Sequence, residues 1–260
     1  MKLLKELNST ETLFLMNPNK VSLKDLLKYT LIDLVYKGVL EIKIVSRKSH
    51  PSDKYVRNYV YVKRGVNFEN YKSLSYERRF LKYFDDEYFE KMQIRSYLKA
   101  IHKGIDSDVD FKSEIQESEN LKKYFGSFKI NLFGLYSYFI RTNDGFKKSE
   151  IIDRELKRLE KIIKNPKDHV SDDLAACLLV GANILLIEDF DQELLNNFHE
   201  FISLNSVDSN LGNIDIDLLF TSLNAITYKN VGIYFSAGCS SGGCVSAGCG
   251  GCSGCGGCGG

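Results

Sequence analysis

Apolar positions near the N-terminus first recur at helical spacing. Residues Ser9 to Leu15 predict a short helix, and Asn17-Pro18-Asn19 predicts a turn after it. Ser22 is a good N-cap residue and Gly38 suits a helix C-terminus, so a second helix is expected between them. Its apolar face consists of Leu23, Leu26, Leu27, Leu31, Leu34 and Val35.

The pattern then changes to that of strands. Residues 39–44 and 56–62 are strand-like, the second with a period of two, and a polar stretch at 46–54 containing Pro51 separates them. Helix, tight turn, helix and β-hairpin in about 60 residues are typical of a winged helix. We therefore expect a mainly α protein with an N-terminal winged helix, a helical body and a disordered Gly/Cys-rich tail.

Helical spacing dominates most of the remaining chain. The expected helices are Leu74 to Tyr83, Glu87 to His102, about Phe111 to Phe125, Lys148 to Lys164, Asp172 to Ile187 and Gln192 to Leu204. Asn143-Asp144-Gly145 is a turn or cap signal, and Ala225 to Phe235 suggests a closing strand. Lys129 to Ile140 fits either a buried helix or strands, because a short apolar run does not fix its own period.

Four segments are expected from these elements. They are a winged-helix-like domain at 1–70, a helical segment at 71–127 with a second winged-helix-like unit as the alternative, a helical domain at 128–235 and a disordered tail at 236–260. The tail contains 11 Gly and 6 Cys and no charged residue. So much glycine loses more backbone entropy than its few apolar atoms can offset on folding.

A family resemblance is carried by several of these stretches. They are Thr10 to Leu15, Leu34-Val35-Tyr36-Lys37-Gly38, Tyr76-Glu77-Arg78-Arg79-Phe80-Leu81 and the Gly/Cys-repeat C-terminus. Together they resemble a family of uncharacterised bacterial membrane proteins that combine winged-helix-like cytoplasmic segments with a Gly/Cys-rich end. The resemblance implies an arrangement of segments and no activity.

Charge is unevenly distributed along a chain whose net charge is +1. Residues 1–80 contain sixteen Lys and Arg against eight Asp and Glu, so the remainder is acidic. The most apolar window, Leu174 to Ile187, is shorter than the roughly 20 residues that a bilayer span needs. With no signal-peptide pattern either, we expect a cytoplasmic protein without a membrane span, although a membrane-associated partner is compatible with it.

The tail cysteines are the sharpest chemical signal. They follow a C-x4-C-x4-C-x2-C-x2-C-x2-C pattern, in which paired spacing lets two thiolates reach one ion. Soft thiolates favour Zn or Cu(I), whereas nothing apolar is present to shield an iron–sulfur cluster. The predicted metal ligands are Cys239, Cys244, Cys249, Cys252, Cys255 and Cys258.

The same cysteines support an alternative chemistry. Each is directly preceded by glycine, whose uncrowded carbonyl is what closure of a thiol to a thiazoline or thiazole requires. The tail therefore resembles the core of azole-containing microcin precursors, in which Cys and Ser become azoles. A low-complexity tail with no specific chemistry is the third interpretation.

Basic residues gather on the predicted hairpin, interleaved with Tyr55, Tyr59 and Tyr61. Phosphate contact by a winged helix requires positive charge here and at the start of the second helix. The candidate nucleic-acid-binding residues are Lys24, Lys28, Arg47, Lys48, Arg57, Lys63 and Arg64. A solvated basic surface, or one that docks on the acidic part of the chain, is favoured over DNA binding.

No sequence motif of catalysis is present. The four histidines are isolated, and phosphate loops, nucleophile elbows and dinucleotide fingerprints are missing. Asp106, Asp108, Asp110 and Glu117 are spaced as in a calcium loop, but Phe111 stands where such a loop needs glycine, so a helix start is favoured. Cys177 lies in an apolar run and is interpreted as an inert core thiol. We expect a non-enzymatic interaction protein with one or more protein partners.

Overall fold

The computed structural model describes residues 2–85, 90–126, 139–164 and 180–187. The elements of the first 64 residues are α1 (Lys2–Glu6), α2 (Ser9–Met16), α3 (Leu23–Tyr36), β1 (Leu40–Lys48) and β2 (Val56–Arg64). The elements that follow are α4 (Ser75–Leu81), η1 (Lys82–Phe84), β3 (Lys91–Gln93), α5 (Ile94–Lys103), α6 (Asp108–Gln116), η2 (Lys122–Tyr124), α7 (Asn143–Lys164) and η4 (Gly181–Leu186). The described chain is mainly α with one three-stranded antiparallel sheet, in the order β1-β2-β3.

Helix α3 begins and ends where its capping residues predict. The Ser22 hydroxyl accepts a hydrogen bond from the backbone N–H of Asp25 at 3.1 Å. After the helix, Gly38 has a φ of 65°, and the N–H of Val39 donates to the Leu34 carbonyl at 2.9 Å. This left-handed turn directs the chain out of α3 and into β1.

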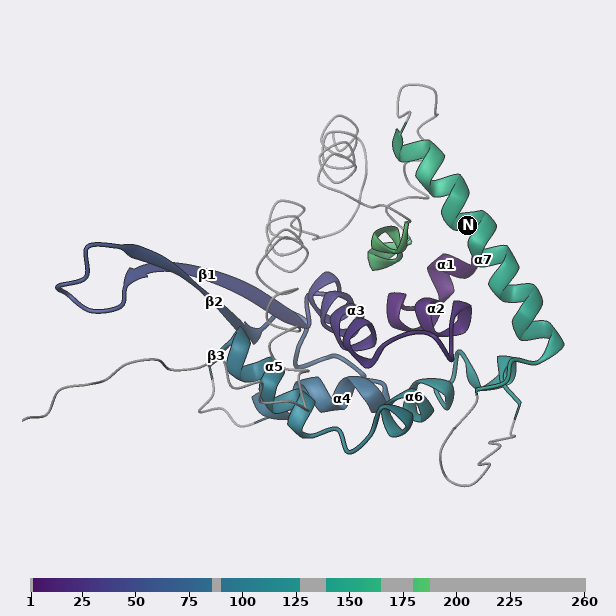
Figure 1. The fold of residues 1–260 in the computed structure, drawn as a ribbon, viewed down its shortest axis with the longest axis horizontal. Coiled ribbons are helices and arrows are strands. Elements are labelled where there is room, and N and C mark those ends of the chain that lie inside the picture. The colour runs from purple at the N-terminus through teal and green to yellow at the C-terminus, as the bar shows by residue number, and fades with distance from the viewer. Residues whose placement is uncertain (1, 86–89, 127–138, 165–179, 188–260) are drawn as a thin grey trace, which may run out of the picture.

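The β1–β2 hairpin projects from one side of the molecule, and α7 runs along the opposite side (Figure 1). The base of the hairpin is fixed by the loop that follows β2. The N–H of Gly65 donates to the Val39 carbonyl at 2.9 Å, and the Asn67 amide donates to the Lys37 carbonyl at 2.8 Å. A side chain at Gly65 would collide with the Gly38 carbonyl, so the two chain segments approach this closely only at glycine.

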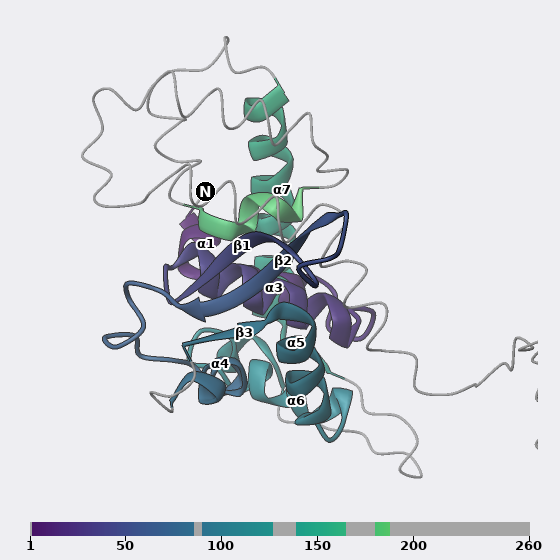
Figure 2. The ribbon, with the colours of Figure 1, turned by 90° about the vertical axis from the view of Figure 1, so that its left-hand side faces the viewer.

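A single hydrophobic core joins the described elements. Helix α3 lies at its centre, with α1 and α2 on one side and α4, α5 and α6 below it (Figures 1 and 2). The sheet crosses in front of α3 when the hairpin faces the viewer (Figure 2). Strand β3 pairs with β2, and Met92 of β3 packs against this core, so the core continues across residue 70.

Two predicted helices of the middle segment require correction. The first is the helix expected over Glu87 to His102, of which the structure describes residues 90–102. Lys91–Gln93 forms strand β3 there, and the helix α5 begins only at Ile94. The helix expected over Phe111 to Phe125 is α6, which starts earlier and ends at Gln116. Backbone pairing with β2 explains the first difference, since a short segment gains its strand hydrogen bonds only from a distant partner.

Two predicted helices of the C-terminal half also differ. Helix α7 begins five residues before Lys148, because the Thr142 hydroxyl accepts a hydrogen bond from the N–H of Gly145 and caps it. The helix expected over Asp172 to Ile187 does not run to its end, because Gly181 has a φ of 63° and starts the 3-10 helix η4. A left-handed residue interrupts an α-helix.

Several predictions fall beyond the ranges that the structure describes. These are most of Lys129 to Ile140, the start of the helix at Asp172, Cys177, the helix Gln192 to Leu204, the strand Ala225 to Phe235 and the whole tail. Within the described ranges, no helix is long and apolar enough to cross a bilayer.

Candidate binding surface on the projecting hairpin

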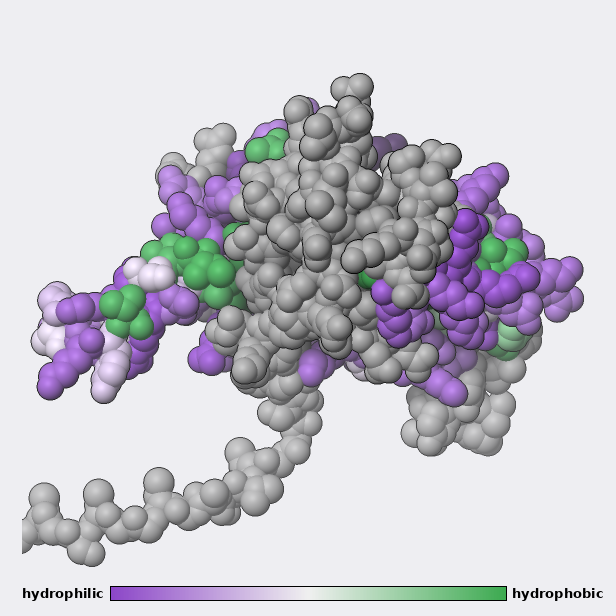
Figure 3. Space-filling view, turned by 90° about the horizontal axis from the view of Figure 1, so that it is seen from above, coloured by the Kyte–Doolittle hydropathy of each residue, from purple (hydrophilic) through white to green (hydrophobic). Residues whose placement is uncertain are grey.

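The pairing register sorts the hairpin side chains into two faces. Residues directly opposite each other on paired strands share a face, and neighbours along a strand alternate. Leu40 pairs with Arg64, Ile42 with Val62 and Ile44 with Val60, which defines an apolar face that packs on the body at its base. Towards the tip this face is exposed, and apolar side chains show on the projecting hairpin in Figure 3.

The other face of the sheet is basic and aromatic. It consists of Glu41, Lys43, Val45, Arg47, Arg57, Tyr59, Tyr61, Lys63, Lys91 and Gln93, and we refer to it as the basic face. It contains five cations, two tyrosines and one carboxylate. Lys43, Arg47, Arg57 and Lys91 are exposed, while both tyrosines are half-buried. Strand alternation therefore concentrates positive charge on the solvent side of the sheet.

Arg47 holds the centre of the basic face together. Its guanidinium lies 4.8 Å from the centroid of the Tyr59 ring and donates to the Tyr61 hydroxyl at 2.8 Å. The ammonium of Lys91, on the β3 edge of the same face, lies 5.4 Å from the centroid of the Tyr61 ring. Cations are attracted to the negative faces of aromatic rings, and Arg47 and Lys91 accordingly each lie over one face of a tyrosine ring.

Two pairs of like charges face each other across the strands of this surface. Arg47 lies opposite Arg57, and Lys63 lies opposite Lys91. Like charges in directly opposite positions destabilise a sheet. The compensation is partial: Glu41 pairs with Lys63 at 2.9 Å, and Asp53 lies 3.6 Å from an Arg57 side chain that is 62% exposed. The basic face therefore retains charge that an anionic ligand would neutralise.

The predicted basic residues of the hairpin do not all lie on this face. Lys48 is on the apolar face. Arg64 turns towards the body, where it donates to Glu69 at 3.0 Å and to the Phe84 carbonyl. Sequence analysis missed Lys43 and Lys91. The strand alternation could have revealed Lys43, whereas Lys91 joins the surface only through β3.

Lys24 and Lys28 belong to another part of the molecule. Both are half-buried near the start of α3, whereas the hairpin follows the end of that helix. Burial lowers the pKa of Lys28. Six consecutive residues of α3, from Thr30 to Val35, are buried, and the Tyr29 hydroxyl donates to the Leu185 carbonyl of η4. Helix α3 is therefore a core helix without a free face over its second half.

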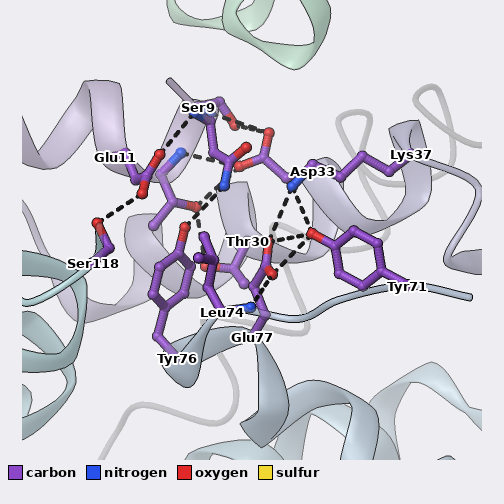
Figure 4. A network of polar contacts seen from close by, with 12 residues as sticks. Ser9, Glu11, Thr30, Asp33, Lys37, Tyr71, Leu74, Tyr76, Glu77 and Ser118 are labelled. Carbon is purple, nitrogen blue, oxygen red and sulfur yellow. Dashed lines mark hydrogen bonds and ion pairs between the residues drawn. The ribbon is translucent and has the colours of Figure 1, made fainter. Parts of the chain in front are cut away.

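Within the body, a network of buried polar groups fixes α2 against α3 (Figure 4). The Asp33 carboxylate accepts hydrogen bonds from the N–H groups of Ser9 and Thr10, both at 3.1 Å, and from the Ser9 hydroxyl at 2.8 Å. These N–H groups lie in the first turn of α2, where no helical carbonyl is available to them. A carboxylate on α3 thus caps another helix, which sequence spacing did not reveal.

Glu11 extends the network to the loop after α6. Its carboxylate accepts hydrogen bonds from the Ser118 hydroxyl at 2.7 Å, from the Asn120 amide and from the N–H of Asn8. Burial raises the pKa of both Glu11 and Asp33, and these hydrogen bonds oppose that shift. Ser118 and Asn120 reach Glu11 from the loop that follows Gln116, which is consistent with the end of α6 at Gln116 and not at the expected Phe125.

A third buried carboxylate connects α3 to α4. Glu77 accepts hydrogen bonds from the Lys37 ammonium at 3.1 Å, from the Tyr71 hydroxyl and from the N–H of Leu74 (Figure 4). Burial alone would lower the pKa of Lys37, but Glu77 and Asp33 outweigh it and raise that pKa. Burial and the charge of Glu77 raise the pKa of Tyr71 to about 12. Every polar group of this cluster has a partner, so its geometry supports a structural role.

The predicted metal ligands of the tail, Cys239 to Cys258, lie outside the described residues. Among the residues that are described, no cluster of three or more His, Cys, Asp or Glu side chains is arranged to hold a metal ion. Asp108 and Asp110 occupy the first turn of α6, and the N–H of Asp110 donates to the Ser107 hydroxyl. The acidic cluster is thus a helix start, as the sequence favours.

Comparisons with protein families, curated proteins and solved structures give no match to this chain. The fold defines a mainly helical protein with a projecting basic hairpin.

Proposed function

We propose that this chain is a non-enzymatic interaction protein whose Cys/Gly-rich tail binds a soft metal ion, Zn or Cu(I). One observation carries the proposal: Cys249, Cys252, Cys255 and Cys258 succeed one another at C-x2-C spacing. Four thiolates at this spacing suit a tetrahedral site, and the glycines between them permit the tight turns that such a site needs.

The folded part would then present the tail to a protein partner. We propose that α2, α3 and the hairpin form a winged-helix-like module that serves in protein contact. The burial of the second half of α3 argues against insertion of this helix into a DNA groove, because a recognition helix needs an exposed face. A winged-helix regulator that reads duplex DNA through α3 is the less favoured hypothesis for the same reason.

Native mass spectrometry of the full chain under reducing conditions tests the metal proposal. We expect Zn(II) or Cu(I) to add mass that a chelator removes. Serine at the last four tail cysteines should abolish this uptake, whereas Cys177→Ser should leave it unchanged, because Cys177 stands alone in an apolar run. A wild-type chain that takes up neither ion would overturn the proposal.

The same spectrum tests the alternative function, a ribosomally made precursor whose tail cysteines and serines become azoles. The observation that favours it is the glycine before each of the six cysteines. Each azole ring removes one water and two hydrogens from the mass of the chain. A chain isolated from its native host that carries this loss, and no chelatable ion, would replace the metal proposal by the precursor one.

A further inference from the structure

We infer that the basic face of the hairpin is a binding site for single-stranded nucleic acid, with bases stacked on Tyr59 and Tyr61 and phosphates held by Lys43, Arg47 and their neighbouring cations. This site lies on the folded body and is independent of the tail and its chemistry. It also differs from a winged-helix interface, because α3 takes no part in it.

The charge of the basic face specifies an anionic ligand. Five cations share one sheet face with a single carboxylate. Four of these cations form two pairs, and the members of each pair lie directly opposite each other on neighbouring strands. Such an arrangement costs stability in the free protein. Phosphates placed between the paired cations would relieve the repulsion, and neutralisation of phosphates by Lys and Arg is the main source of affinity for nucleic acids.

The tyrosines specify the form of that ligand. Tyr59 and Tyr61 are two residues apart on β2, so their side chains stand about 6.7 Å apart on the same face. Two separate rings flanked by cations are typical of surfaces on which successive unpaired bases stack. Bases of a duplex are already stacked on each other and have no free ring face to offer.

The opposite face of the hairpin argues against a membrane as the partner. A membrane-binding surface combines basic residues with apolar side chains that enter the lipid together. Here the exposed apolar side chains, Ile44 and Val56, lie on the apolar face, whereas Lys43 and Arg47 lie on the basic face. The apolar face has Lys48 as its one exposed cation, and the basic face has no exposed large apolar side chain to insert into a bilayer.

Fluorescence anisotropy with the full chain tests the inference. The probes are a labelled oligothymidine of about 20 nucleotides and a duplex of the same length, compared over a series of salt concentrations. We expect the single strand to bind roughly tenfold more tightly than the duplex. Lys43→Gln should weaken binding and lower the slope of log affinity against log salt by about 0.7, the value for one lost phosphate contact on a single strand.

Substitution of the rings separates stacking from charge. Tyr59→Leu and Tyr61→Leu should each weaken binding roughly fivefold or more while leaving the salt slope unchanged, because they remove a stacking surface and no cation. The matched control is Lys48→Gln, which removes the same charge from the opposite face and should change affinity less than about twofold. Circular dichroism checks that every variant is folded.

Four results would each overturn the inference. They are a duplex bound as tightly as the single strand, tyrosine variants with unchanged affinity, a Lys48→Gln effect as large as that of Lys43→Gln, and tighter binding to polyglutamate or to phosphatidylserine vesicles than to the single strand. The last result would assign the basic face to an acidic protein or to a membrane. None of them depends on metal uptake by the tail.

Discussion

At the scale of single residues, buried carboxylates decide how the helices are joined. Asp33 and Glu11 lie inside the protein, yet each accepts several hydrogen bonds from groups that belong to other elements. Removal of a carboxylate from water is costly unless its oxygens are satisfied. The network therefore fixes one relative position of α2 and α3, because any other position leaves donors and acceptors without partners.

This burial makes stability depend on pH. Burial raises the pKa of Glu11, so the folded chain holds a proton there at pH values at which the unfolded chain has lost it. Its contribution is fully present below the unfolded pKa, about 4, and is lost as the pH rises through the folded pKa. We expect the free energy of unfolding of the wild type, minus that of Glu11→Gln, to fall over this window in urea denaturation.

Exposed Glu150 provides the control, since Glu150→Gln makes the same chemical change on the surface. The expected fall is about 1.4 kcal/mol for each unit by which the folded pKa exceeds the unfolded one. Parallel curves for wild type and Glu11→Gln across the window would contradict a raised pKa at this position.

At the scale of elements, short segments adopt the conformation that their neighbours allow. Lys91–Gln93 is a strand because β2 offers it an edge, and η4 is a 3-10 helix whose first residue is left-handed. Asn183 within η4 donates to the carbonyls of Leu4 and Leu7 and joins this turn to α1. Such contacts outweigh the helical preference of an apolar run.

Gly181 is a position at which the conformation of an element, η4, depends on glycine. An alanine there would retain a φ of 63° at a steric cost, and its Cβ would meet the Tyr36 ring at 3.3 Å. We expect Gly181→Ala to lower the free energy of unfolding by about 1–2 kcal/mol in urea denaturation. Gly126→Ala is the control, because only the Ile140 carbonyl lies near its Cβ, at 3.7 Å. Equal effects of the two substitutions would show that η4 does not require glycine.

At the scale of the whole molecule, the body and the outer hairpin contribute differently to stability. No residue from Val45 to Tyr59 is buried, whereas Ile42, Val60 and Val62 belong to the core. This outer part of the hairpin, residues 45–59, therefore buries little apolar surface and contributes little to the free energy of unfolding. This separation is what a surface for ligands requires, because changes there do not affect the core.

Removal of the outer hairpin tests this division. Ile44 lies directly opposite Val60, so an Asn-Gly turn can join these two residues in place of 45–59. We expect the shortened chain to unfold cooperatively in urea with a free energy within about 1 kcal/mol of the wild type. It should also lose affinity for the single-stranded probe. A loss of cooperative unfolding would mean that the body depends on the outer strands.

Local signals in the sequence determined the elements whose stabilising contacts lie close along the chain. Ser22 and Gly38 set the limits of α3, and the period of two predicted β2 with its alternating burial. Capping and alternation depend on residues a few positions apart, so they can be read without knowledge of the fold.

Only the tertiary structure decided which distant residues meet. It paired Lys91 with Lys63, turned Arg64 inward and buried the second half of α3. The physical reason is that β3 and the α2 cap at Asp33 gain their hydrogen bonds from groups far away in sequence. No spacing along the chain encodes those partners, whereas the packed core permits only one set of them.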